Sequence, residues 1–218
     1  MRRKKQESGI EYDEKLLQHI APIGNMTPYN SYCRTGTGYE ACVHIFSLPT
    51  MLDDFWMTDI CNFQNSVATI SIGTMDEVKV KQNLNKAIEE QASRMRFAKD
   101  YSAYYDAKSR EEEMQRLYEE ISSLGEVMKS ISMRIFVTAK TKQTMEERVA
   151  KTIKTLEGNN YRAAIFLNEA ESEWKSIYQS MEEQQLEPHA LSGFPMKATL
   201  LAAGNAYHYS CLEDDGGD

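Results

Sequence analysis

The chain has 218 residues, of which 41% are hydrophobic and 27% are charged, and its net charge is −8. These proportions are typical of one folded core with at most an appendage, and they exclude global disorder. No segment approaches the roughly 20 apolar residues of a membrane-spanning helix, and no apolar stretch of a secretory signal follows residues 1–9. Without the four basic residues at positions 2–5 the remainder carries −12. This charge argues against direct nucleic-acid binding.

Short runs with strand-like alternation recur along the chain. Tyr39–Phe46 alternates between two faces, and Tyr29–Arg34 precedes it across a turn that contains Gly36 and Gly38, so a β-hairpin is expected. In Ser130–Thr138 the odd-numbered residues form one apolar face. The other expected strands are Val67–Ile72, Tyr161–Leu167 and, with a weaker pattern, Ala206–Leu212.

Helix-start patterns follow the four better strands. Each pattern puts a Thr or Asn side chain three residues before an acid, so that the first can cap the opening turn and the second can complement the helix dipole. The four patterns are Thr50–Asp53, Thr74–Glu77, Thr144–Glu147 and Asn168–Glu171, and helical spacings follow each, Trp174, Ile177 and Met181 after the last. Strands that alternate with helices predict an α/β or α+β fold.

A long segment without proline or glycine, Met75–Leu124, is the unusual part of the chain. An unbroken helix of this length would span about 75 Å, whereas a compact domain of this size has a radius of gyration of about 17 Å. The segment is therefore expected to fold back as a helical hairpin or to project as an arm. Its apolar stripe changes phase near Tyr104–Glu111, and Gly125 is expected to end it. Residues Leu186–Lys197 predict a loop.

The fold expected is α+β: an α/β sandwich with a mainly antiparallel sheet and helices on one side, of which the ferredoxin-like arrangement is one form. A parallel doubly wound sheet fits the same order of elements and stays open. The predicted domain organisation is a basic N-terminal arm (1–27), an α+β core (28–74 and 125–212), a long helical insertion (75–124) and a linker (213–218).

Few residues predict chemistry. The phosphate-binding loop GxxxxGK[ST] does not occur in the sequence, and Gly36–Gly38 fits a hairpin turn better. Cys42 and His44 share one strand face with Cys33 nearby, which allows a zinc site or a Cys/His nucleophile pair, but their spacing fits core packing better.

Clusters of acids could in principle supply paired catalytic carboxylates. Glu111–Glu113, Glu119–Glu120 and Glu169–Glu173 lie in helical stretches that also contain lysine, so a solvated face is the better interpretation. We therefore expect no catalytic residues, no metal ligands and no cofactor in this chain.

The basic N-terminal residues allow two interpretations. Arg2, Arg3, Lys4 and Lys5 form either a solvated tail or a membrane-facing cluster, since each basic residue near an anionic surface contributes about 1 kcal/mol. Free thiols are expected at positions 33, 42, 61 and 211, because four cysteines without a CxxC pair do not form a disulfide framework.

Five sequence blocks resemble the amino-terminal region of Gram-positive conjugation ATPases of the VirB-four (TraE/TrsE) type. They are GIEYDEKLLQHIAPIGNM (9–26), TGTGYEACVHIFS (35–47), DFWMTDI (54–60), EISSLGEVMKSISMRIFVT (120–138) and AAIFLNEAESEWKSIYQ (163–179). The resemblance covers nearly the whole chain in consistent order.

The resemblance implies an amino-terminal α/β domain that precedes a RecA-like motor. Family members are motors at the cytoplasmic face of the inner membrane, assemble into oligomers that are often hexamers, and dock on inner-membrane components of a secretion or conjugation channel. ATP and Mg²⁺ would belong to the motor domain. In relatives that domain follows the stretch that matches Tyr207–Gly216, where this sequence stops, so ATPase activity is not expected here.

The function expected is therefore a non-catalytic docking and assembly domain of a type IV secretion ATPase, with protein partners and a peripheral membrane contact. Two alternatives from other classes remain: a small enzyme with a Cys/His metal site, and a free-standing coiled-coil adaptor that oligomerises through Met75–Leu124.

Overall fold

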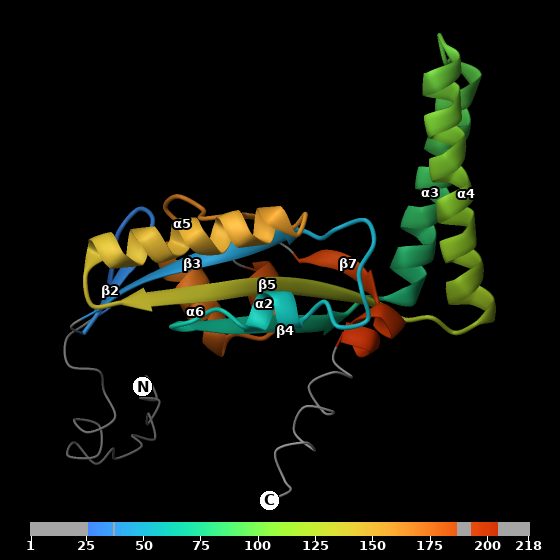
Figure 1. Ribbon diagram of the computed structural model, residues 1–218. Helices are drawn as coiled ribbons and strands as arrows, with labels where there is room; N and C mark the ends of the chain where they lie inside the picture. Colours follow the sequence, from blue (N-terminus) through green and yellow to red (C-terminus); the bar gives the residue numbers. More distant parts are fainter. Residues whose placement is uncertain (1–25, 37, 187–192, 205–218) are drawn as a thin grey trace, which may run out of the picture.

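The computed structural model describes residues 26–36, 38–186 and 193–204, and it confirms the predicted α+β class with a helical hairpin (Figure 1). A seven-stranded sheet has the order β1-β2-β3-β5-β4, with β6 beside β3 and β7 beside β5. The strands are β1 (Thr27–Pro28), β2 (Cys33–Thr35), β3 (Gly38–Ser47), β4 (Ser66–Thr74), β5 (Met128–Ala139), β6 (Arg162–Ala164) and β7 (Phe194–Lys197). Every pairing among these strands is antiparallel, so the parallel doubly wound alternative is wrong.

Four of the strands have the ferredoxin-like order β6-β3-β5-β4. β3 leads through α2 (Thr58–Cys61) to β4, and β5 leads through α5 (Lys142–Gly158) to β6. Each helix therefore joins two strands with one antiparallel strand between them, which is the split β-α-β arrangement. β4 and β5 are neighbours that a short turn could connect, and the helical arm is inserted between them.

One face of the sheet carries the apolar core. Successive side chains of a strand point to opposite faces, so the odd-numbered residues of β3 and β5 share this face, as their alternation predicted. α5 lies along it in Figure 1. The core includes Ala41, Val43, Ile45, Ile131, Met133, Ile135 and Val137 from the strands and Trp56, Met57, Ile60, Met145, Val149 and Leu156 from the α2 region and α5.

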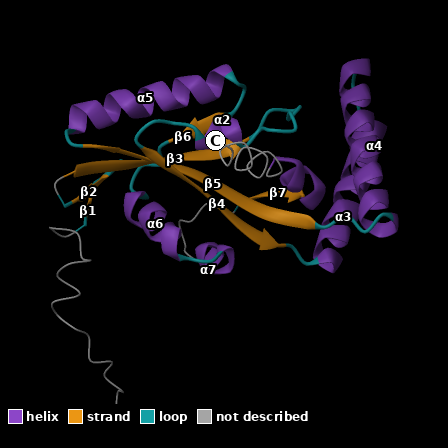
Figure 2. Ribbon diagram, turned by 60° about the horizontal axis from the view of Figure 1, so that its bottom comes forward, coloured by secondary structure: helices purple, strands orange, loops and turns teal. Residues whose placement is uncertain are grey.

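Short helices cover the opposite face, so the expectation of helices on one side is wrong. α6 (Ala170–Lys175), the 3₁₀ helix η1 (Ser176–Tyr178) and α7 (Met181–Leu186) lie on the side of the sheet away from α5 (Figure 2). The helical spacing that follows Asn168 therefore does not form one helix, because the backbone is extended at Gln179. This second layer encloses polar side chains of the sheet.

None of the four predicted capping residues is the observed N-cap. α3 begins after Asp76, whose carboxylate accepts a hydrogen bond from the backbone N–H of Lys79, and α5 begins after Thr141, which accepts from the N–H of Thr144. No helix begins at the pattern that starts with Thr50, and the next helix in the chain is α2. Side chains that can cap lie within a few residues of one another here, so local spacing alone does not choose among them.

The inserted segment forms a helical hairpin that stands away from one end of the sheet (Figure 1). It consists of α3 (Glu77–Arg96) and α4 (Tyr101–Ser123). The chain turns at residues 97–100, earlier than the predicted phase change, because the Asp100 carboxylate accepts from the N–H of Ala103 at 2.8 Å and starts a new helix. Gly125 has φ +71°, a conformation that suits glycine after a helix end.

The end of the described chain corrects one further prediction. Phe194–Lys197, expected as loop, pairs with Met128–Ile131 as β7, an edge position where Pro195 is tolerated. Residues 198–204 are helical. In the described part of the chain no helix is long and apolar enough to cross a membrane. The predicted strand Ala206–Leu212 and the linker 213–218 lie outside the described residues.

We expect Gln91→Met to stabilise the arm. Gln91 is 6% exposed in α3, and its side-chain oxygen has no hydrogen-bond partner among the described residues. An unpaired buried polar group costs about 1–3 kcal/mol, and methionine keeps a similar length and a good helix propensity. Urea denaturation followed by circular dichroism should show a free energy of unfolding about 1 kcal/mol higher. The exposed Gln82→Met in the same helix is the control and should change little; equal effects in both variants would contradict the prediction.

Candidate functional site

The three residues considered for a metal or nucleophile site lie beneath α6. Cys33 Sγ donates to the carbonyl oxygen of Ala170 at 3.2 Å, and Cys42 Sγ lies 3.8 Å from a carboxylate oxygen of Glu173. Burial raises the pKa of Cys33 to about 11 and also raises that of Cys42, so both thiols are neutral near pH 7. In residues 26–36, 38–186 and 193–204 no group of three or more His, Cys, Asp or Glu side chains could hold a metal. The geometry does not support the zinc or nucleophile alternatives.

His44 belongs instead to a buried ionic cluster, which we define as His44, Arg134, Glu173 and Gln184. His44 and Arg134 lie directly opposite each other on β3 and β5, and α6 places Glu173 between them. His44 Nδ1 lies 2.8 Å from one oxygen of Glu173, and Arg134 Nε donates to the other. All four side chains are at most 5% exposed.

Gln184 connects this cluster to α7 and to the edge of the sheet. Its side-chain oxygen accepts a hydrogen bond from Arg134 Nη1 at 2.9 Å, and its amide nitrogen donates to Ser71 Oγ and to the carbonyl oxygens of Ser176 and Gln179. One side chain therefore ties β4, β5, η1 and α7 together. The ionic cluster fastens the second helical layer to the sheet.

Glu173 is ionised in the folded protein. Burial by itself raises the pKa of a carboxyl, but the hydrogen bond and charge of His44, together with Arg134, outweigh burial and hold the pKa of Glu173 below its usual value. The prediction of a solvated face is therefore wrong for Glu173. Little in the sequence signalled this, because Arg134 lies on the polar face of β5 and its burial becomes evident only once α6 and α7 cover that face.

The root of the arm is fixed to the sheet. Val80 and Ile121 of the two helices pack against Met128 at the start of β5. Lys197 of β7 forms an ion pair with Glu120 of α4 at 2.9 Å, and Glu126 accepts a hydrogen bond from the Thr199 hydroxyl at 2.6 Å. The arm is thus held by contacts with β5 and β7, and the connection from α4 to β5 is tied to Thr199 just after β7.

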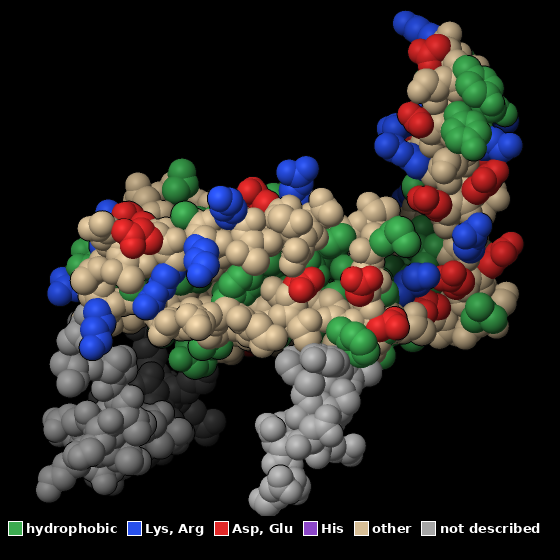
Figure 3. Space-filling view, in the orientation of Figure 1, with side chains coloured by type: hydrophobic (Ala, Val, Ile, Leu, Met, Phe, Trp, Pro, Cys, Tyr) green, Lys and Arg blue, Asp and Glu red, His purple; other side chains and the backbone are tan. Residues whose placement is uncertain are grey.

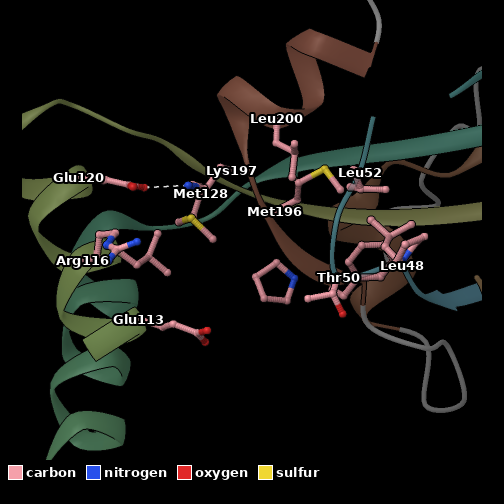
Figure 4. Close-up of a pocket in the computed structure, with 14 residues that line it drawn as sticks. Leu48, Thr50, Leu52, Glu113, Arg116, Glu120, Met128, Met196, Lys197 and Leu200 are labelled. Carbon is pink, nitrogen blue, oxygen red and sulfur yellow. Dashed lines mark hydrogen bonds and ion pairs between the residues drawn. The ribbon is translucent and has the colours of Figure 1, made fainter. Parts of the chain in front are cut away.

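A groove of about 580 Å³ lies between this root and the end of the sheet (Figure 4). Glu113, Arg116 and Glu120 of α4 form a charged wall, and the facing wall is apolar. Figure 4 shows Leu52, Met196 and Leu200 on that facing side, with the Glu120–Lys197 ion pair along one margin. The groove thus combines one charged wall with one mainly apolar wall.

The free end of the arm carries a tip surface, which we define as Phe97, Tyr101, Tyr104 and Tyr105. Their exposed fractions are 80%, 78%, 42% and 58%. Tyr101 lies one turn before Tyr104 and Tyr105 on α4, and the rings of Tyr101 and Tyr105 stack with centroids 6.1 Å apart. Figure 3 shows hydrophobic side chains gathered near the free end of the arm with both basic and acidic side chains around them. The tip surface is therefore a candidate interaction site.

The basic residues Arg2, Arg3, Lys4 and Lys5, predicted as membrane-facing, lie outside the described residues. The tip surface was not predicted as a site from the sequence. The sequence shows the aromatic residues, but their exposure depends on where the hairpin turns, and the sequence predicted only a phase change further along, near Tyr104–Glu111.

No family model matches the chain. A Bacillus anthracis protein named only as uncharacterized protein pXO2-09 is 24% identical over 206 residues, which are 94% of this chain and 32% of that protein. The chain therefore spans about a third of the length of this relative. The similarity extends over the sheet, the arm and the second helical layer together.

Proposed function

We propose that this chain is the amino-terminal docking and assembly domain of a conjugation or type IV secretion ATPase of the VirB-four type. It binds inner-membrane components of the transfer channel at the cytoplasmic face of the membrane and does no chemistry of its own. In the parent enzyme, ATP and Mg²⁺ belong to a separate motor domain, and assembly into hexamers arranges several copies of this domain around the channel.

The observation that carries the proposal is the rooted, projecting arm. Its root is fastened by an apolar cluster, an ion pair and a hydrogen bond, while its free end exposes aromatic side chains. A long hairpin that is fixed at its root and exposes aromatic side chains at its free end is suited to binding a partner. Among the described residues it contributes no side chain to a catalytic site in the body of the domain. The five sequence blocks and a relative about three times as long as the matched segment support the same proposal.

The competing interpretations have less support. A Cys/His enzyme would need a thiolate or an open metal site, whereas burial keeps the thiols of Cys33 and Cys42 protonated. A coiled-coil adaptor would need an unpaired apolar stripe, whereas α3 and α4 pack against each other within one chain, as Val80 and Ile121 show.

Competition in donor cells tests the proposed function. The chain expressed in cells that carry the corresponding transfer system should occupy the docking partner of the resident ATPase and lower the frequency of DNA transfer. The control variant replaces residues 77–123 by a short Gly-Ser turn, which the neighbouring strands β4 and β5 permit, and it should not compete. The purified chain should hydrolyse no ATP. Turnover above background, or an equal effect of both forms on transfer, would refute the proposal.

A further inference from the structure

We infer that the tip surface of the arm binds the interfacial region of an anionic phospholipid membrane. The inference deepens the proposed function, on which it rests for its biological setting, by naming the partner of the free end of the arm. Three observations support the inference: the exposed aromatic side chains of the tip, the positive charge around them and the length of the arm.

The side chains of the tip suit a lipid–water interface. Tyrosine has an apolar ring and a polar hydroxyl, and it is enriched where membrane proteins meet the headgroup region. Phe97, at the turn itself, is the most exposed of the aromatic residues and the deepest anchor.

The charge of the tip is opposite to that of the protein. Residues 94–110 contain five basic and two acidic side chains, a net charge of +3, or +1 when Glu90 and Glu112, the partners of Arg94 and Lys108, are counted with them, whereas the whole chain carries −8. Among the described residues Arg94 pairs with Glu90 and Lys108 with Glu112, while no ion pair engages Arg96 or Lys99. Both side chains are exposed and lie within two residues of Phe97 in the sequence, so they are available to an anionic partner.

The length of the arm keeps the acidic body of the protein away from an anionic surface that the tip contacts. An acidic body is repelled by an anionic surface, but this repulsion falls off over a Debye length of about 8 Å at physiological salt. α4 has 23 residues and is therefore about 34 Å long. A tip in contact with the headgroups thus keeps most of the acidic body several Debye lengths away. A protein partner would not require this separation, and so the charge pattern favours the membrane.

Vesicle binding of the purified full chain tests the inference. The chain should sediment with vesicles of phosphatidylcholine and phosphatidylglycerol, bind phosphatidylcholine alone far more weakly, and dissociate as salt is raised. Each basic residue near an anionic surface strengthens binding about fivefold, so R96E/K99E should weaken binding at least tenfold. K151E/K154E on α5 makes the same change of charge at exposed positions away from the tip and is the matched control. It should bind as the unaltered chain does.

A spectroscopic variant separates contact by the tip from contact elsewhere. Phe97→Trp places an indole at the tip, and its emission, after subtraction of the signal from the unaltered chain, should shift to shorter wavelength with anionic vesicles. A chain with Arg2, Arg3, Lys4 and Lys5 all changed to alanine should still give this shift.

Four results would overturn the inference: no binding to anionic vesicles, equal losses in R96E/K99E and K151E/K154E, no shift for Phe97→Trp, or loss of binding only in the N-terminal variant. If R96E/K99E abolished competition for DNA transfer while no form bound vesicles, the tip would belong to a protein partner and the lipid inference would fall. The vesicle assay contains no transfer proteins, so its failure would leave the proposed docking function standing.

Discussion

Glu173→Gln is expected to lower the free energy of unfolding by about 3–5 kcal/mol, because it leaves the buried guanidinium of Arg134 without a counter-charge. Glu173 is 5% exposed and receives hydrogen bonds from both basic members of the ionic cluster. An amide preserves the size of the side chain, so the loss measures mainly the missing charge. Urea denaturation followed by circular dichroism gives the value.

Two further variants make this prediction specific. Glu171→Gln changes an exposed acid of the same helix, whose ion pair with Lys175 is solvated, and should cost less than about 0.5 kcal/mol. Arg134→Met in the Glu173→Gln background removes the orphaned charge and should recover part of the lost stability. A cost below about 1 kcal/mol for Glu173→Gln, or no recovery in the double variant, would show that the cluster does not hold the second helical layer.

The same carboxyl should make stability depend on pH. Its folded pKa lies below the ordinary 4.5 because His44 and Arg134 outweigh burial. A carboxyl with a depressed folded pKa stabilises the fold above its unfolded pKa, and this contribution is lost as the pH falls through the folded value. The unaltered chain should therefore lose stability below about pH 4.5, and the difference between it and Glu173→Gln should shrink over the same range. A difference that stays constant with pH would contradict this assignment.

Trp56→Ala should cost about 3–5 kcal/mol, because it empties a large site in the core. Trp56 is 2% exposed, and its indole N–H donates to the carbonyl oxygen of Leu200 at 3.2 Å. Gly204 lies so close that a Cβ there would approach the indole nitrogen to 2.4 Å. The ring therefore joins the apolar core to residues 198–204, and its removal should loosen that segment as well as the core.

Phe55→Ala is the matched control for this prediction. Phe55 is the neighbouring aromatic residue and is 50% exposed, so its loss should cost about 1 kcal/mol or less. Gly204→Ala should destabilise the unaltered chain but cost much less in the Trp56→Ala background, where the ring it collides with is gone. Equal costs in the two backgrounds would show that Gly204 does not pack on the indole.

Local patterns predicted the sheet better than the helix ends. The alternation in β3 and β5 correctly placed Val43, Ile45, Met133 and Ile135 on one apolar face, since successive side chains of a strand point to opposite faces of the sheet. The helix starts were displaced by several residues, as at Thr141, because more than one nearby side chain could cap. β7 was missed since a short strand with a proline carries little signal until its pairing with β5 is known.

The sequence predicted the candidate site less well than it predicted the fold. Tyr101 and Phe97 are visible as aromatic residues, but whether they pack inside a hairpin or stand exposed depends on the position of the turn at Asp100. Glu173 looked like one more solvated acid, because nothing near it in the chain reveals that α6 lies on the polar face of the sheet.

By itself, the sequence determined the alternating faces of the strands, the α+β class and the need for Met75–Leu124 to fold back or project. These features follow from the spacing of apolar residues and from segment length, which can be read within one element of the chain. The tertiary structure decided which face each helix covers, where the arm turns and which charges are buried. The partners of Glu173 in the ionic cluster, His44 and Arg134, lie 129 and 39 residues away along the chain. Whether an ionic side chain is buried depends on such distant partners. The residues next to Glu173 in the sequence therefore do not predict its burial.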